Sequence, residues 1–457
     1  MEEEKLLRKI HQTERSLGVY DDTILGVPLW RLVRHFSRVR YLDSQVGLSY
    51  GSTASKGQGK AKLQFFSGFW KYVGKKNLNV FFPFNRLSNV RGEYLDKFVD
   101  PVISQTKIEN GYFFILDPPN YVGDYKRVHK DHTVTNEGRT VLSQFFKYWF
   151  RLWTPIRYGK KIRNLYNKCK EEFCLDDACL KFYKDKVSSF LSSYYYYLFW
   201  FRILKPKRVF VVFREAYFSQ IAVCKRLGIP VAEFQHGITI GDSKSFTGEY
   251  DSRIDPDYFL IFGEFWRGPQ YGMPLDKMFC TGWAYKDFLA KKLGDKVEKK
   301  EGKILVISSP PITDSIIAAL TELSKSEGNY GFDLRLHPCE KFSAVQQEKL
   351  NQIKNAQIVD NTIESAIALL SYDYVVGENS SVIYEALSVG CKVGMLNLGG
   401  LRPPVDKPGI KDNFYVINNC GDFEQFLQEG PNKSSAKVEF YSNFESQAFM
   451  NFINEKM

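Results

Sequence analysis

The sequence contains no uninterrupted run of about 20 apolar residues, the length that a helix needs to cross a membrane. The best candidate, residues 190–204, is broken by Ser192, Ser193 and Arg202. The first ten residues, MEEEKLLRKI, are charged and lack the apolar core of a secretory signal peptide. We therefore expect a cytoplasmic protein that does not span a membrane.

Motifs for disulfides and metals are also missing. The eight cysteines form no CxxC pair and have no spacing typical of a zinc site, so we expect reduced thiols. The one Asp-x-Asp sequence, Asp255-Pro256-Asp257, precedes a predicted strand and favours a turn. The sequence therefore predicts neither a metal site nor a bound cofactor.

The chain has 457 residues, too many for one hydrophobic core, so two domains are expected. Its net charge of +11 is unevenly distributed. Residues 1–230 hold 40 basic and 21 acidic side chains, whereas residues 231–457 hold 23 basic and 31 acidic ones. The basic half is suited to an anionic partner such as a membrane surface, a phospholipid-linked substrate or a nucleic acid.

Short apolar runs alternate with helical patterns through the second half. Strands are predicted at 258–262, 278–280, 303–308, 333–336, 357–359, 372–376, 392–396 and 414–417, and helices at 313–325, 344–352, 363–370 and 381–388. In the first half, strands at 79–84 and 112–116 precede a clear βαβ unit from 208 to 237. This alternation predicts an α/β fold with parallel sheets covered by helices on both faces.

The stretch Gly377 to Gly390, GENSSVIYEALSVG, has the layout of a phosphate site. It follows a buried strand and opens a helix, so Ser380 and Ser381 fall at the N-cap and first turn, where free N–H groups and the helix dipole favour an anion. Glu385 lies one turn later, and its carboxylate is a natural acceptor for ribose hydroxyls. An ordinary capped helix with a solvated glutamate is the alternative interpretation.

Two further polar clusters follow predicted strands. Gln235-His236-Gly237 ends the βαβ unit, and His337 follows the strand DLRL. The carboxyl ends of parallel strands are the usual ligand edge of such sheets. An imidazole placed there can donate to a phosphate or accept a proton from a hydroxyl, because its ordinary pKa is near neutrality.

Together, EFQHGI, LHP and NSSVIYEAL resemble bacterial cell-surface polysaccharide glycosyltransferases with the two-Rossmann glycosyltransferase-B fold. These families include capsule Kdo transferases, bacterial sialyl- and polysialyltransferases, and CDP-glycerol glycerophosphotransferases. The resemblance covers roughly residues 205–400. It implies two Rossmann-like domains facing a cleft, with an acceptor-binding domain at 1–238, a nucleotide-donor domain at 239–440 and a C-terminal helix at 441–457.

The resemblance also implies roles for residues. The donor-binding set would be His337, Ser380, Ser381, Glu385, Gln235, Gly237 and Asn379, with His337 and the two serines on the phosphate and Glu385 on the ribose. His236 would stand at the cleft as base or phosphate ligand. The acidic-acidic-Gly base motif of sialyltransferases is not evident, so Glu215, Glu233 and Asp242 stay open as bases beside His236. Glu215 is the second catalytic candidate that we name.

Residues 145–163, FFKYWFRLWTPIRYGKKIR, mix aromatic and leucine positions with many cations. Such a segment fits a bilayer interface, with its rings among headgroups and its cations against anionic lipid. A core helix followed by a basic loop is the alternative, because aromatic stripes are more often packing than anchoring. The tyrosine run 194–197 has the same two interpretations.

The leading hypothesis is a membrane-peripheral, metal-independent glycosyltransferase that takes a nucleotide-sugar donor and extends a capsule or lipopolysaccharide chain on a lipid-linked acceptor. A polyol-phosphate transferase of the CDP-glycerol type would use the same clusters. A sugar-nucleotide 2-epimerase shares the architecture but needs no interfacial segment. A nucleic-acid-binding protein is the least favoured class, because the basic residues form no recognisable binding motif.

Overall fold

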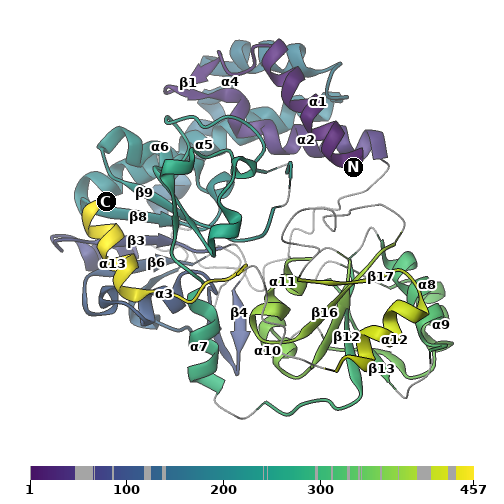
Figure 1. The fold of residues 1–457 in the computed structure, drawn as a ribbon. Coiled ribbons are helices and arrows are strands. Elements are labelled where there is room, and N and C mark those ends of the chain that lie inside the picture. Colours follow the sequence, from purple (N-terminus) through teal and green to yellow (C-terminus); the bar gives the residue numbers. More distant parts are fainter. Residues whose placement is uncertain are drawn as a thin grey trace.

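The computed structural model describes residues 2–46, 65, 67–84, 87–117, 125–135, 140–239, 241–243, 245–293, 297–309, 312–326, 330–337, 340, 342–360, 363–378, 380–398, 413–430 and 439–457. Two separate parallel sheets dominate the fold (Figure 1). The α/β class with helices on both sheet faces, as predicted, is confirmed. No helix in these ranges combines the length and apolarity required to cross a membrane.

The first sheet has seven parallel strands in the order β11-β10-β9-β8-β3-β6-β7. Their bounds are β3 (Asn79–Phe82), β6 (Phe113–Leu116), β7 (Thr133–Val134), β8 (Arg208–Val211), β9 (Val231–Phe234), β10 (Tyr258–Ile261) and β11 (Met278–Cys280). Two small antiparallel hairpins accompany it, β1 (Thr23–Ile24) with β2 (Val27–Pro28) and β4 (Ser88–Val90) with β5 (Glu93–Leu95). Because β10 pairs with β9 and β11 pairs with β10, the boundary predicted at 238/239 falls inside the first sheet.

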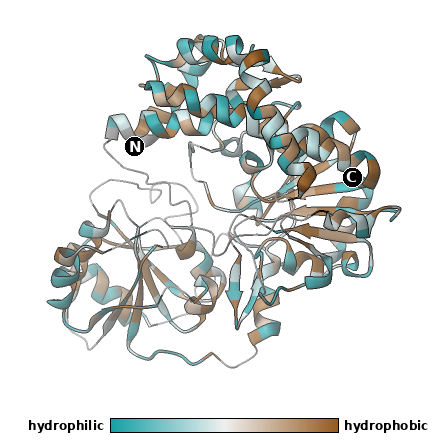
Figure 2. Ribbon diagram, turned by 180° about the vertical axis from the view of Figure 1, so that it is seen from behind, coloured by the Kyte–Doolittle hydropathy of each residue, from teal (hydrophilic) through white to brown (hydrophobic). Residues whose placement is uncertain are grey.

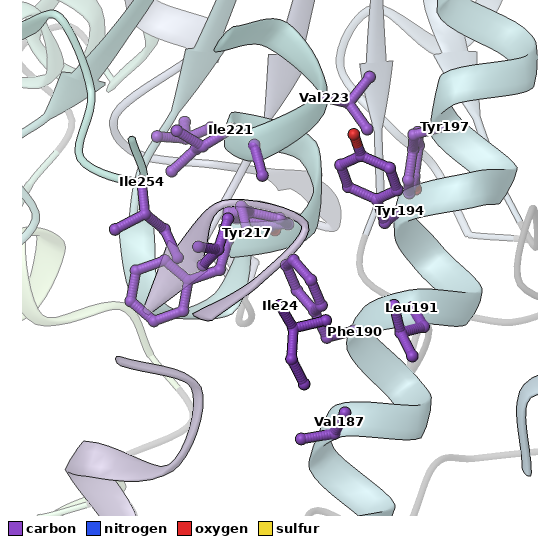
Figure 3. Packing of buried hydrophobic residues seen from close by; sticks show 14 of the residues in the cluster. Ile24, Val187, Phe190, Leu191, Tyr194, Tyr197, Tyr217, Ile221, Val223 and Ile254 are labelled. Carbon is purple, nitrogen blue, oxygen red and sulfur yellow. The ribbon is translucent and has the colours of Figure 1, made fainter. Parts of the chain in front are cut away.

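The two faces of the first sheet are covered by different helices. Val80 and Phe82 face α5 (Asp177–Leu204) and α6 (Phe218–Leu227). Phe81 faces the opposite layer, which contains α3 (Asp100–Ser104), α7 (Ala284–Leu293) and α13 (Ser446–Glu455). Figure 3 shows how α5 contributes Val187, Phe190, Leu191, Tyr194 and Tyr197 to the first of these layers. The tyrosine run is therefore packing.

Four helices form a layer of their own beyond the first sheet (Figures 1 and 2). They are α1 (Glu2–Ser16), α2 (Leu29–Val46), α4 (Val141–Cys169) and the first half of α5. Helix α4 passes through Pro155 without ending, so the expected core helix followed by a basic loop is wrong. Proline removes one backbone hydrogen bond there, but its exposed position leaves the freed carbonyl open to water.

The second sheet has six parallel strands in the order β14-β13-β12-β15-β16-β17. They are β12 (Lys303–Ile307), β13 (Gly331–Arg335), β14 (Ala356–Ile358), β15 (Tyr374–Gly377), β16 (Lys392–Leu396) and β17 (Tyr415–Ile417). Helices α8 (Thr313–Leu323), α9 (Ala344–Asn351) and α12 (Cys420–Gln428) cover one face, and α10 (Ser365–Leu370) and α11 (Ser381–Ser388) cover the other.

The chain crosses between the two domains twice and ends on the first. Phe449 of α13 stacks near Phe234, and Arg208 of β8 donates to Asn454 Oδ1 at 3.0 Å. The returning segment passes very close to β10, because a Cβ added at Gly263 would lie 2.9 Å from the carbonyl oxygens of Glu439 and Phe440. The C-terminal helix α13 therefore packs against the first sheet (Figure 1, yellow).

Candidate active site

The order of the second sheet changes direction between β12 and β15, because β13 and β14 extend from one side of β12 and β16 and β17 from the other side of β15. In doubly wound sheets, ligands bind beyond the carboxyl ends of the strands at this switch point. A cavity of about 460 Å³ lies there, within the size range of small-molecule sites. It is lined by Leu87, Ser88, Asn89, Tyr94 and Lys97 from the first domain and by Ile307, Ser308, Arg335, Leu336, His337, Ile363, Glu364, Ser365, Ser380, Ser381, Val382 and Glu385 from the second.

Helix α11 begins at this cavity as the sequence predicts. Ser380 is its N-cap, and the Ser380 hydroxyl accepts a hydrogen bond from Val382 N at 3.4 Å. The preceding strand approaches the helix closely at Gly377, where an added Cβ would lie 3.1 Å from Ile383 Cγ2 and 3.3 Å from Ile307 Cβ. The absence of a side chain at Gly377 therefore lets the strand end and the helix start meet at the cavity wall.

The loop after β13 brings His337 to the same cavity. Glu340 fixes this loop, because its carboxylate accepts from His337 N at 2.8 Å and from the Ser308 hydroxyl at 2.7 Å. The hydroxyl of Thr313, the first residue of α8, also donates to Glu340. One carboxylate thus ties together the ends of β12 and β13 and leaves the His337 side chain exposed at the cavity.

Glu385 is the most buried carboxylate of the cavity wall, with its side chain 5% exposed. Its Oε1 accepts from Lys97 Nζ at 2.9 Å, and its Oε2 is buried with no hydrogen-bond partner among the described residues. A buried carboxylate oxygen without a donor is costly, and a hydroxyl of a bound ligand would relieve that cost. Glu385 lies one turn after Ser381 in α11, and its contact with a ribose stays a prediction.

A second carboxylate, Glu364, stands beside Glu385. It is the N-cap of α10, and its Oε2 accepts from Ala366 N at 2.7 Å and Ile367 N at 3.3 Å. Burial raises the pKa of Glu364, the charge of Lys97 lowers it, and the charge of Glu385 raises it again. The positive charge of Lys97 therefore acts on both Glu364 and Glu385 at the boundary between the domains.

Sequence reasoning missed several residues of this cavity: Lys97, Ser308, Arg335 and Glu364. Ser308 and Arg335 had a usable signal, since each ends an apolar strand of the second half. Glu364 precedes a short helix, as an N-cap residue does. No local sequence pattern pointed to Lys97, because its partner Glu385 lies 288 positions away in the sequence.

The structure places His236 at the end of β9, outside the lining of this cavity. Its half-buried ring lies among Phe84, Phe213 and Phe246, with ring centroids 5.3, 4.8 and 5.6 Å away. Burial, with help from the charges of Arg214 and Lys97, lowers the pKa of His236 to about 4, against a backbone hydrogen bond at Val212. The positive charge of Lys97, which lines the cavity, therefore also acts on His236.

The neighbours of His236 have other contacts. The Gln235 amide donates to Gly237 O at 3.0 Å and to the Tyr271 hydroxyl at 2.8 Å, and its oxygen accepts from Phe262 N at 3.0 Å. These bonds hold the loops after β9 and β10 together. Gln235 and Gly237 do not line the cavity, and Asn379 lies outside the described residues.

Glu215 belongs to a buried ionic network under helix α2, away from the cavity lining. Its carboxylate lies 3.2 Å from His35 Nδ1. Burial raises the pKa of Glu215 to about 7, although Arg34, Arg31, Arg38 and Arg214 all lower it. The other acids of this network are Glu14, Glu233 and Asp255.

Glu233 pairs with Arg214 Nε at 2.5 Å, and Asp242 pairs with Arg8 Nε at 2.8 Å. Both acids are therefore already engaged by a guanidinium.

In the described ranges, no group of three His, Cys, Asp or Glu side chains is arranged to hold a metal ion.

No protein-family model matches this sequence, and no curated protein matches it. Among solved structures, the UDP-GlcNAc 2-epimerase of Methanocaldococcus jannaschii is similar with a TM-score of 0.50 and 12% identity, over 83% of this chain and 99% of the epimerase. The Neisseria meningitidis UDP-GlcNAc 2-epimerase bound to UDP-GlcNAc has a TM-score of 0.47 and 13% identity, with the same coverages.

The lipopolysaccharide outer core galactosyltransferase WaaB, in its apo form, is similar with a TM-score of 0.44 and 11% identity, over 83% of this chain and 100% of its own. At such identities a structural likeness shows the fold alone. The chain has two Rossmann-like domains of the glycosyltransferase-B type, which is the fold class predicted from the sequence.

Proposed function

We propose that this protein is a glycosyltransferase that moves a sugar from a nucleotide-sugar donor to a growing surface polysaccharide on a lipid-linked acceptor. The observation that carries the proposal is the meeting of His337, Ser380 and Glu385 in one cavity at the switch point of the second sheet. These residues come from two separate strand ends and a helix. The family resemblance implies donor contacts for the same three residues.

In this proposal the nucleotide occupies the cavity between the domains. Glu385 Oε2 accepts a ribose hydroxyl, which gives that buried oxygen the donor it lacks. The phosphate lies at the start of α11, where backbone N–H groups, the Ser380 and Ser381 hydroxyls and His337 surround it. Lys97 adds a positive charge from the first domain.

The reaction is a displacement at the anomeric carbon of the donor sugar. The acceptor oxygen forms the new bond, the bond from carbon to phosphate oxygen breaks, and its electron pair stays on the nucleotide. The negative charge of the leaving group is met by helix N–H groups, Lys97 and His337, whose fixed positions lower the cost of charge development.

His236 is the base in this scheme, and Glu215 is the rival. The pKa of His236, near 4, keeps the imidazole neutral at pH 7. One ring nitrogen donates to the backbone at Val212, so the unpartnered Nδ1 carries the lone pair that can take the proton of the acceptor hydroxyl. Gln235 and Gly237 act through the loop that holds His236, and Asn379 remains a proposed donor contact.

Nucleotide binding tests the proposal first. We expect one of CMP, CDP, UDP or GDP to raise the melting temperature, because a ligand that binds only the folded state stabilises it. Glu385→Gln should reduce that rise, whereas Glu322→Gln, on the exposed side of α8, should leave it unchanged. Stabilisation that is equal in wild type and Glu385→Gln would contradict the ribose contact.

Two alternatives use the same cavity. One is a sugar-nucleotide 2-epimerase, which shares this fold, as the Methanocaldococcus jannaschii enzyme does. Incubation with UDP-GlcNAc and no acceptor separates the classes, because an epimerase forms the C2 epimer whereas a transferase leaves the sugar unchanged. A polyol-phosphate transferase would instead be stabilised by CDP and would release CMP only in the presence of acceptor.

A further inference from the structure

Helix α4 carries a row of large apolar side chains on its solvent side. The row consists of Val141, Phe145, Tyr148, Trp149, Leu152 and Ile156, with exposed fractions of 39, 56, 61, 53, 74 and 82%. We call these six residues the α4 stripe. Their spacings of three and four residues place them on one face of the helix.

The opposite face of α4 is the one that packs. Phe150 is 5% exposed and stacks on Tyr195 of α5 with ring centroids 5.0 Å apart, and Thr154 is fully buried. The helix thus already has a complete core contact, and the α4 stripe is additional apolar surface. Helix α4 belongs to the helical layer at the end of the molecule away from the second sheet (Figures 1 and 2).

The charge around the α4 stripe has one sign. Lys147 and Arg151 are exposed on α4 beside it, and Arg157, Lys160, Lys161 and Arg163 are exposed in the next two turns. Residues 141–170 contain no acidic side chain. A helix with a large apolar face, amphipathic Tyr and Trp rings and flanking cations has the chemistry of a segment that lies in the headgroup region of an anionic bilayer.

A second copy of the chain is a poorer occupant. A symmetric contact through the α4 stripe would bring the cations of one helix against those of the other, and residues 141–170 offer no acidic partner to offset that repulsion. An anionic lipid surface can bury the apolar side chains of this face and pair with its cations. We propose that the α4 stripe is the surface by which this protein binds an anionic membrane.

The proposed function includes a lipid-linked acceptor and therefore contact with a membrane. The membrane-binding role of the α4 stripe rests on that proposed function. Vesicle binding needs neither nucleotide nor acceptor. The chain can therefore fail to bind vesicles and still bind a nucleotide, or bind vesicles and fail to bind a nucleotide, so the two proposals are tested separately. The probe is the full chain with vesicles of phosphatidylcholine, alone or with about one-third phosphatidylglycerol, a fraction high enough to give a clearly negative surface.

We expect the wild-type chain to co-sediment with the anionic vesicles and to bind neutral vesicles at least tenfold more weakly. The triple variant Trp149→Ser, Leu152→Ser, Ile156→Ser should lower the partition coefficient at least tenfold, and Lys147→Gln with Arg151→Gln about fivefold per charge at low salt. The matched control is Leu275→Ser with Val345→Ser, which removes apolar side chains that are 52 and 60% exposed on other elements.

Far-ultraviolet circular dichroism and melting temperature show whether each variant folds. If the triple variant unfolds, brominated lipid provides a second test, because it should quench wild-type tryptophan fluorescence and quench Trp149→Phe less. Equal binding of the triple variant and the control, or equal quenching of wild type and Trp149→Phe, would overturn the proposal. So would a chain that ignores anionic vesicles, or a dimer that the triple variant converts to monomer.

Discussion

Lys97 Nζ lies 2.9 Å from Glu385 Oε1, and this ion pair joins the first domain to the helix that begins at the candidate nucleotide site. The two side chains are 22 and 5% exposed. Glu364 lies in the field of the same lysine. Whether this ion pair forms therefore depends both on how the two domains pack and on which ligand occupies the cavity.

Replacing Lys97 by methionine should destabilise the protein by about 1–3 kcal/mol at pH 8, because two buried carboxylates lose their cation. The loss should be smaller at pH 5. Burial already raises the pKa of Glu364 above its usual value, and such a group binds its proton more tightly when folded, so stability falls as pH rises. Removal of Lys97 strengthens that dependence, as urea unfolding at the two pH values would reveal.

Lys292→Met is the matched control for Lys97→Met. Lys292 is another lysine of the first domain that pairs with a carboxylate, but its partner Glu93 retains Lys126 as a second cation. The control should cost less than about 1 kcal/mol. A control that is as damaging as Lys97→Met, or a Lys97→Met loss that does not change with pH, would argue against the shared role of Lys97.

Ser380→Ala should separate capping from ligand binding. It removes the N-cap of α11 and should cost about 1 kcal/mol of unfolding free energy. It should also reduce the nucleotide-induced rise in melting temperature. Ser343→Ala removes the N-cap of α9, which lies outside the cavity lining, and should cost as much without affecting the nucleotide response. Identical nucleotide responses in the two variants would mean that Ser380 serves only its helix.

The pH dependence of turnover distinguishes the two proposed bases. If His236 takes the proton, kcat/KM should stay level from pH 8 down to about 5 and fall as the pH approaches 4, where the imidazole becomes protonated. If Glu215 does so, the fall should begin near pH 7. His236→Asn should in the first case lower kcat by roughly a hundredfold or more.

Two glycines should respond to alanine in opposite directions. Gly377→Ala should destabilise by about 1–3 kcal/mol, because the new methyl group crowds Ile383 and Ile307 at the start of α11. Gly159→Ala, within α4, adds a carbon that has no atom within 4 Å apart from its chain neighbours and its own helix backbone, and should stabilise by about 0.5–1 kcal/mol. Thermal or denaturant unfolding measures both, and a neutral Gly377→Ala would show that the strand end tolerates a shift.

Local patterns predicted much of the second domain. Strand β16 and helix α11 have the bounds expected from the sequence, and Ser380 caps α11 as its position after a buried strand requires. These features depend on neighbours within a few residues, so hydrophobic periodicity and capping chemistry are sufficient to find them.

The first domain was less predictable. Strands β10 and β11 follow the QHG cluster and look like part of the second domain in sequence, yet β10 pairs with β9 and β11 pairs with β10. Helix α4 has mixed aromatic and basic positions, and periodicity alone could not decide whether the aromatic side faces a core or water. Only the position of α5 against Phe150 settles which face is buried.

The sequence by itself determined the parallel α/β class and the placing of Ser380, Ser381 and Glu385 on one helix start, because both follow from short-range steric and hydrogen-bonding preferences. Tertiary structure decided that Lys97 meets Glu385, that Gln235 binds its own domain and that His236 lies outside the cavity lining. Contacts between residues far apart in the chain depend on how whole sheets pack, which no local pattern encodes.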